Sequence, residues 1–215
     1  MPCQQGAFNL DLIIIGAGGH GKVVADAARM SNRWNRIAFV DDIYPKNKKC
    51  SSWDIIGSIN SMSLDASAEF VVAIGDNYTR FKVFSNLKGK GMKAASIVHP
   101  TAYISPDSVI GSGTVVLANA VINIGSSLGD CCIVNTSTTI DHDCVIGNSA
   151  HISPGANLAG EVNVGDFSWV GIGAAIRQQV CIGNDVVVGA GAVVLNDIAD
   201  KLIVVGVPAK PLLAS

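Results

Sequence analysis

Aliphatic residues recur at every sixth position through the second half of the chain. Four residues after each of them the side chain is nearly always small or β-branched, as at Ala102, Ser108 and Thr114. A register of this length predicts a β-solenoid, in which one aliphatic residue per short strand stacks on its counterparts in the adjacent coils. The aliphatic positions are Val98, Ile104, Ile110, Val116, Ile122, Leu128, Val134, Ile140, Ile146, Ile152, Leu158, Val164, Val170, Ile176, Ile182, Val188 and Val194.

Glycine often follows the aliphatic position, and we expect these glycines to take a positive φ in the turns between strands. They are Gly111, Gly129, Gly147, Gly165, Gly171, Gly183 and Gly189. Cys132 and Cys144 occupy small-residue positions of the repeat, which predicts that they belong to the core. The uncharged run from Ser108 to Gly129 contains glycines and asparagines and keeps the same register, so no membrane span is predicted there.

Before the repeat, the pattern alternates between short apolar runs and helix-like segments. Strands are expected at Leu12–Ile15, Ile37–Val40, Phe70–Ile74 and Ala94–Val98, and helices at Gly21–Met30 and Tyr78–Lys90. This order predicts a small parallel α/β domain over residues 10–97, followed by a solenoid domain over residues 98–215.

The first expected strand runs directly into the glycine-rich stretch GAGGHG, Gly16 to Gly21, which opens a helix. Such a turn binds phosphate esters at the helix N-terminus. Asp41 and Asp42 follow the next strand, where a dinucleotide fold places an acid on the ribose. Fewer than ninety residues precede the solenoid, however, which leaves room for about one mononucleotide half. The turn therefore favours a single nucleotide over NAD.

Composition narrows the function classes further. The chain has 15 basic and 17 acidic residues, so it shows no basic stripe for nucleic acid. Six cysteines form no CxxC pair, which predicts no metal, and the start of the chain lacks the features of a signal peptide. We therefore expect a cytoplasmic protein with reduced thiols.

The motifs GAGGHGKVV, VDD and AIGDNYTR, combined with the downstream hexads, resemble bacterial nucleotide-sugar N-acetyltransferases, which adjoin the sialic-acid O-acetyltransferases. The resemblance implies a Rossmann-like sheet followed by a left-handed β-helix of hexapeptide repeats. Three hexads make one coil in that family, so seventeen hexads imply between five and six coils. Members are usually homotrimers with active sites between subunits, and they serve glycan or polysaccharide biosynthesis.

The same resemblance implies the substrates. The solenoid would bind acetyl-CoA as co-substrate, and the N-terminal domain would bind a nucleotide-linked 4-amino-4,6-dideoxy sugar. UDP is preferred here, with dTDP or GDP as alternatives. By motif, the nucleotide sugar would contact Gly18, Gly19, His20, Asp41, Asp42 and Gly75.

Acetyl transfer to an amine needs a base, and the family motif places that base on His142. Asp143 would raise its basicity, while His151, Ile172 and Ala190 would contact acetyl-CoA. His142 and His151 lie nine residues apart, which is half of an eighteen-residue coil. They should therefore lie on opposite sides of one solenoid, so that neighbouring subunits contribute them to a direct transfer.

Three alternatives stay open. O-acetylation of a sialic acid would keep the fold and change the acceptor. A zinc enzyme resembling γ-type carbonic anhydrase would need three converging histidines. A trimeric NAD-binding scaffold without catalysis would use the glycine turn alone.

Overall fold

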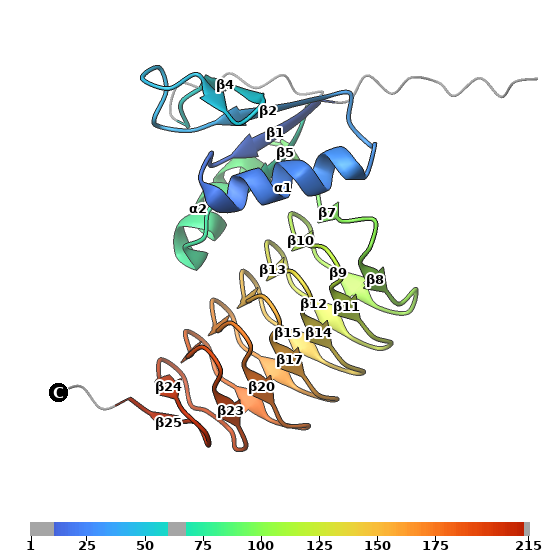
Figure 1. The fold of residues 1–215 in the computed structure, drawn as a ribbon, viewed down its shortest axis with the longest axis vertical. Coiled ribbons are helices and arrows are strands. Elements are labelled where there is room, and N and C mark those ends of the chain that lie inside the picture. The colour runs from blue at the N-terminus through green and yellow to red at the C-terminus, as the bar shows by residue number, and fades with distance from the viewer. Residues whose placement is uncertain (1–10, 60–67, 213–215) are drawn as a thin grey trace, which may run out of the picture.

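The computed structural model describes residues 11–59 and 68–212. Residue 10 and residues 213–215, the outer limits of the two expected domains, lie outside this range. A small sheet with two helices stands at one end of a long stack of coils, and the C-terminal segment lies at the other end (Figure 1). No helix within the described ranges is long and apolar enough to cross a membrane.

The N-terminal sheet has the strand order β3-β4-β2-β1-β5-β6. Its core strands are continuous apolar runs because both faces are covered, as in other parallel sheets. All neighbouring strands are parallel except β3 and β4. The elements are β1 (Asp11–Ile15), α1 (Gly19–Met30), β2 (Arg36–Val40), β3 (Lys49–Cys50), β4 (Trp53–Gly57), β5 (Glu69–Val72), α2 (Asn77–Gly89) and β6 (Lys93–Ala94).

The expected parallel sheet is confirmed, with two differences. The single strand expected over Ala94–Val98 is wrong, because the chain forms β6 in this sheet and then β7 (Ile97–Val98) in the first coil. The β3–β4 hairpin was not expected. Its first strand has two residues, too few for any periodicity to register.

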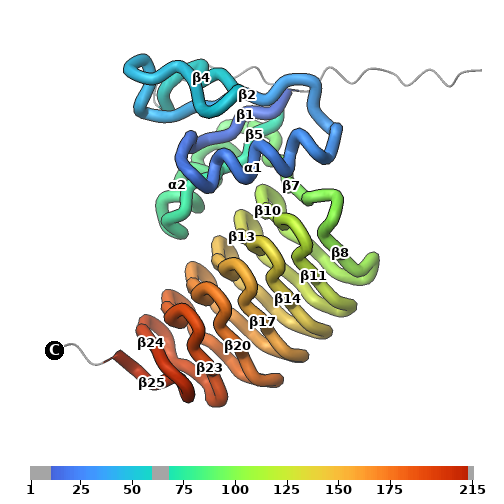
Figure 2. Tube along the Cα trace, in the orientation of Figure 1, coloured from blue at the N-terminus to red at the C-terminus, as the bar shows by residue number. Residues whose placement is uncertain are grey.

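The solenoid has three strands per coil, as expected. Each strand from β7 to β20 pairs in parallel with the strand eighteen residues further on, for example Val115 with Ile133, and the last coil is shorter, with Val187 paired to Ile203. Figure 2 shows the coils as a regular stack. The strands form three faces. The first face holds β7, β10 (Val115–Val116), β13 (Ile133–Val134), β16 (His151–Ile152), β19 (Trp169–Val170), β22 (Val187–Val188) and β24 (Ile203–Val205), with β25 (Lys210–Pro211) at its edge.

The second face holds β8 (Tyr103–Ile104), β11 (Val121–Ile122), β14 (Thr139–Ile140), β17 (Asn157–Leu158), β20 (Ala175–Ile176) and β23 (Val193–Val194). The third face holds β9 (Val109–Ile110), β12 (Ser127–Leu128), β15 (Val145–Ile146), β18 (Asn163–Val164) and β21 (Cys181–Ile182).

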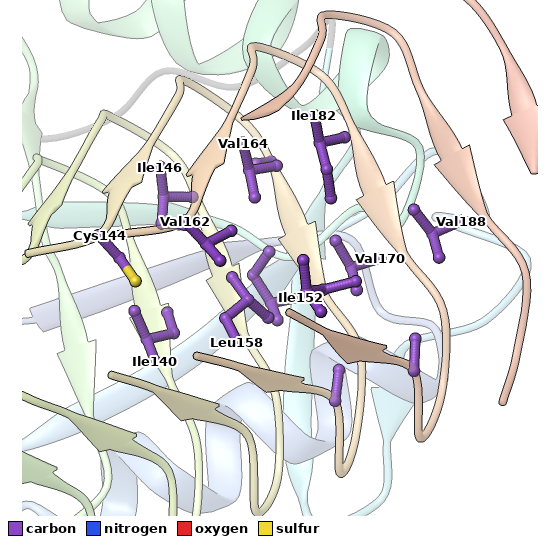
Figure 3. Packing of buried hydrophobic residues seen from close by; sticks show 14 of the residues in the cluster. Ile140, Cys144, Ile146, Ile152, Leu158, Val162, Val164, Val170, Ile182 and Val188 are labelled. Carbon is purple, nitrogen blue, oxygen red and sulfur yellow. The ribbon is translucent and has the colours of Figure 1, made fainter. Parts of the chain in front are cut away.

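The repeating aliphatic residues fill the solenoid interior (Figure 3). Ile140, Ile146 and Ile152 come from the three successive faces, and Leu158 lies next to Ile140 in the following coil. Every repeat position from Val116 to Val194 is buried, and so are Cys132 and Cys144. The three positions of the first coil are less buried because no coil precedes them. Burial of this unbroken column is the main stabilising term of the domain.

The glycines that follow the aliphatic positions have a different role from the expected one. None of the seven has a positive φ; that conformation falls two residues later, on residues such as Cys131 and Phe167. A Cβ on Gly111 would instead lie 2.3 Å from the backbone of Gly129 in the next coil. These positions are therefore glycine because neighbouring coils approach closely there.

A ladder of side chains runs along the corner between the third and first faces. Each member accepts a hydrogen bond from the backbone N–H of the member one coil earlier, at 2.6–3.0 Å. The order along the ladder is Asp130, Asn148, Asp166, Asn184 and Asp200. Because Asp and Asn alternate, no two carboxylates occupy adjacent rungs.

The N-terminal domain packs on the first face. Val24 and Ala28 of α1 share one buried cluster with Ile97, Val115 and Ile133, which point outward from the first three strands of that face. Further along the face, the outward positions are His151, Trp169 and Val187, and these are not covered by α1. The packing therefore leaves a cleft between the start of α2 and the middle of the first face.

Candidate active site

His142 lies at the corner between the second and third faces, in the turn that joins β14 to β15. Its Nδ1 lies 2.9 Å from Oδ2 of Asp143, and its backbone N–H donates to Asp141 Oδ1 at 2.8 Å. The hydrogen bond to Asp143 raises the pKa of His142 above its ordinary value, and the charges of Asp141 and Glu161 act in the same direction. With Nδ1 occupied and its side chain 49% exposed, the imidazole presents Nε2 as a proton acceptor.

Gly160, in the next coil, makes room for this imidazole. A Cβ on Gly160 would lie 2.4 Å from Nε2 and 2.5 Å from Cε1 of His142. Its φ is not in the left-handed region, so the backbone does not require glycine there. An eighteen-residue coil places Gly160 beside His142, and this spacing is the signal that could have found the contact, although Gly160 lies outside any motif.

The cleft on the first face has a volume of about 480 Å³. His151 forms part of its floor, and its ring lies parallel to that of Trp169, with 5.7 Å between the centroids. Trp169 is itself fixed by a 2.6 Å hydrogen bond from Nε1 to Ser153 Oγ. The remaining walls come from Gly75, Asp76, Asn77, Tyr78, Phe167, Asp185 and Val187.

Burial, together with the smaller effects of the Arg80 charge and of His20, lowers the pKa of His151 to about 3. His20, in the first turn of α1, has its pKa lowered to about 4, again mainly by burial and then by Arg80. Both imidazoles are therefore neutral at physiological pH. Within the described part of the chain, His20 Nε2 is buried without a hydrogen-bond partner, which marks it as a group available to a ligand.

The glycine turn contains a second cavity, of about 240 Å³. Gly18 caps α1 without a side-chain hydrogen bond, which leaves the first amides of the helix available to an anion. A Cβ on Gly18, Gly19 or Gly75 would meet nothing within 4 Å. The fold does not need glycine at these three positions, so their bare backbone leaves space for a bound molecule. Around the cavity lie Ala17, Gly18, Lys22, Asp41, Ile43, Asn47, Lys49, Cys50, Ser51 and Ile55.

Asp41, which lines this cavity, and its neighbour Asp42 both accept backbone hydrogen bonds that fix nearby loops. Asp41 Oδ2 accepts the N–H of Ala17 at 2.7 Å, and its Oδ1 accepts the N–H of Ile43 at 2.9 Å. Asp42 Oδ1 accepts the N–H of Ile59 at 3.0 Å. Asp41 therefore braces the glycine turn, and it still lines the cavity with its carboxylate.

The residues expected to contact acetyl-CoA lie together along the first face. Ile172 and Ala190 occupy the corner between the first and second faces in adjacent coils, and both are exposed. They follow the strands that carry Trp169 and Val187. His142 lies at the corner opposite the first face, so one chain does not bring His142 and His151 together. Arg80, Trp169 and Gly160 were not expected in the site, although Arg80 ends the motif AIGDNYTR.

The architecture and this pair of sites define a β-helix acyltransferase, and comparisons with known proteins support that class. Residues 11–87 match the family model described as the PglD N-terminal domain. The acetyltransferase domain of PglB from Neisseria gonorrhoeae FA1090 is 43% identical, with a TM-score of 0.91 over 94% of this chain and 99% of that one. A second structure of that domain contains acetyl coenzyme A.

Two further relatives support the same class of protein. PerB from Caulobacter crescentus, in complex with CoA and GDP-perosamine, is 36% identical, with a TM-score of 0.86 over 94% of this chain and 97% of that one. UDP-N-acetylbacillosamine N-acetyltransferase from Bacillus subtilis (strain 168) is 32% identical over 112 residues, a match that spans 50% of this chain and 51% of that protein. The chain belongs to the bacterial nucleotide-sugar N-acetyltransferase family.

Proposed function

We propose that the protein transfers the acetyl group of acetyl-CoA to the 4-amino group of a nucleotide-linked 4-amino-4,6-dideoxy sugar. One observation carries the proposal: two features occur in the same chain. The first is an open glycine turn at the N-terminus of α1, and the second is a solenoid on which His142 and Asp143 form a hydrogen-bonded pair. Relatives that span the whole of this architecture are described with acetyl coenzyme A, or with CoA and GDP-perosamine.

His142 is the general base of the proposed reaction. The sugar amine attacks the thioester carbonyl carbon, so that a C–N bond forms and the C–S bond breaks. The proton lost by the amine passes to His142 Nε2, and CoA leaves as a thiolate that takes up a proton. Asp143 accepts a hydrogen bond from Nδ1 and stabilises the imidazolium, as its effect on the pKa of His142 requires. Transfer is direct, without an acetyl-enzyme.

The site is assembled between subunits of a homotrimer. Within one chain His142 lies at the corner opposite the face that carries His151, so a shared site needs a neighbouring subunit. The surface around His142 supports this arrangement: Ile124, one coil earlier at the same corner, is 55% exposed, and Val145 on the adjoining face is 49% exposed. Apolar side chains that recur on one surface mark a contact with a partner.

In this arrangement the solenoid binds acetyl-CoA and the N-terminal domain binds the nucleotide sugar. His151, Ile172 and Ala190 contact acetyl-CoA along the first face. Gly18, Gly19, His20, Asp41, Asp42 and Gly75 surround the nucleotide sugar, with its phosphates at the N-terminus of α1. UDP is the preferred nucleotide, which the name of the Bacillus subtilis relative supports, while the GDP-perosamine bound to PerB keeps GDP as the alternative.

The reaction takes place in the cytoplasm. All five described cysteines are free, and four of them are buried, as expected of a protein in a reducing compartment. Among the described residues of one chain, no group of three or more histidines, cysteines and acids is placed to hold a metal ion. The proposed chemistry uses none.

The test is CoA release from acetyl-CoA, followed with a thiol reagent across a panel of acceptors. The panel holds UDP-, dTDP- and GDP-linked 4-amino-dideoxy sugars, their 4-hydroxy counterparts and a free sialic acid. Enzyme without acceptor corrects for the exposed thiol of Cys181. Release with one amino sugar, and not with its 4-hydroxy counterpart, is the expected result. Release with sialic acid alone would replace N-acetylation by O-acetylation.

A further inference from the structure

Arg80 of α2 is buried to 1% exposure, and all five N–H donors of its guanidinium are used. Every acceptor is a backbone carbonyl or a side-chain amide, and no carboxylate in the described residues accepts a bond from it. The bonds are Nε to Cys131 O at 2.9 Å, Nη1 to Ile74 O at 3.1 Å and Gly75 O at 3.0 Å, and Nη2 to Asn77 Oδ1 and Ser149 O, each at 2.7 Å.

These acceptors belong to two separate walls of the cleft. Gly75 and Asn77 form the wall contributed by the N-terminal domain. Ser149 lies two residues before His151, at the start of the strand that forms the floor. Ser149 Oγ also donates to Asn77 O at 2.8 Å, and Asn77 Nδ2 donates to Phe167 O at 2.7 Å. Arg80 is therefore the centre of the polar contact that fixes one wall against the other.

Among the residues that the structure describes, no carboxylate forms an ion pair with this guanidinium. The nearest acid that acts on it is Asp76, whose carboxylate accepts the N–H of Thr79 at 2.8 Å and is largely exposed. The Cys131 and Cys132 thiols beside it are neutral, because burial raises their pKa values to about 12 and about 11. Asp185, on the opposite rim of the cleft, is engaged by the Tyr78 hydroxyl. A fixed, buried positive charge therefore lies behind the residues that line the cleft.

We propose that Arg80 is a positioning residue that holds the Gly75–Asn77 wall in register with the strand carrying His151 and gives the cleft a permanent positive potential. Such a potential adds to the effect of burial, which keeps the His20 and His151 imidazoles neutral and able to bind a ligand without repelling one another. On the proposed function, it also favours the negative charge that develops on the thioester oxygen during acetyl transfer. Conversion of Arg80 to lysine keeps the charge, but three donors cannot replace five in a fixed fork.

The test separates charge from geometry. Asn77→Asp keeps the size of the native side chain and places a carboxylate 2.7 Å from Nη2, with the loss of the hydrogen bond that Asn77 Nδ2 donates to Phe167 O. It should neutralise the potential, whereas Arg80→Lys should keep it and loosen the wall. Asn86→Asp, the same change on the exposed surface of α2, is the matched control.

Imidazole NMR titration is the first measurement, because four histidines can be assigned by single replacements. In the wild type, in Arg80→Lys and in Asn86→Asp, we expect His20 and His151 to stay neutral at about pH 5, where an unperturbed histidine is charged. In Asn77→Asp, both titration midpoints should rise by about one pH unit. Midpoints that do not move in Asn77→Asp would overturn the proposal, and this result does not depend on which substrate the enzyme uses.

Kinetics are the second measurement, once a substrate is known. Asn77→Asp should lower kcat about tenfold, while Arg80→Lys should mainly raise KM for the nucleotide sugar. If the Arg80 variant does not fold, Asn77→Asp carries the test by itself. A fall in rate that is equal in both variants, with no change in either titration, would show that Arg80 has a structural role alone.

Discussion

Gly160→Ala tests whether the position of the His142 ring matters. The new Cβ would lie 2.4 Å from Nε2, 2.5 Å from Cε1 and 3.0 Å from Cδ2 of His142. Non-bonded heavy atoms pack at about 3.5 Å or more, so the imidazole has to move by about 1 Å. A displacement of that size at a reacting group costs about a hundredfold in rate. We therefore expect kcat to fall about a hundredfold, with acetyl-CoA binding nearly unchanged.

The assay is steady-state CoA release with the best acceptor, accompanied by acetyl-CoA titration and thermal unfolding. Gly89→Ala is the control, because a Cβ there meets nothing within 4 Å and its φ is not positive. In a His142→Ala background, Gly160→Ala should cost nothing further in rate, since the two changes act on one group. A Gly160→Ala enzyme with wild-type kcat would refute the account, and so would a loss that is fully additive with His142→Ala.

Three further predictions concern pH and charge. Asp143→Asn removes the hydrogen-bonded charge that raises the pKa of His142, so the acidic limb of the kcat profile should move to lower pH while the maximal rate falls at least tenfold. His20 and His151 have folded pKa values of about 4 and about 3, so the unfolded chain binds more protons below about pH 6.5 and stability should decrease as the pH falls. Between pH 7 and pH 5 each should contribute roughly 2 kcal/mol to that loss, measurable by urea unfolding at the two pH values, and unchanged stability would contradict it. Asn148→Asp would place carboxylates on three adjacent rungs of the corner ladder, and should destabilise the protein by about 1 kcal/mol, less at high salt.

The repeat could be predicted from the sequence because its spacing directly reports the packing. Each inward residue from Val116 to Val194 contacts its counterparts in neighbouring coils, so the period is visible without any structure. The His142–Asp143 contact was also accessible, since the two residues are adjacent in the chain. Their catalytic roles, like those of the other expected site residues, remain predictions.

The contacts that the sequence did not reveal share a physical cause. Arg80 bonds mainly to backbone carbonyls, and a carbonyl acceptor requires no particular residue type. Gly160 makes room for the His142 ring one coil away, and the sequence does not show that this ring lies against the glycine. Glycine is found both where φ is positive and where two backbones approach closely, and a sequence does not distinguish the two cases. The glycines after the aliphatic positions were assigned to the first case, but the close approach of Gly111 to Gly129 is an example of the second.

Mixed trimers test the central claim, acetyl transfer at a site shared between subunits. His142→Ala and His151→Ala subunits, each inactive alone, are co-expressed with different tags, and the mixed species is assayed for CoA release with the preferred nucleotide amino sugar. If neighbouring subunits supply the two histidines, each mixed trimer keeps one intact site of its three, and roughly a third of the wild-type rate should return. If no activity returns in trimers shown to contain both subunits, the two histidines do not serve one shared site.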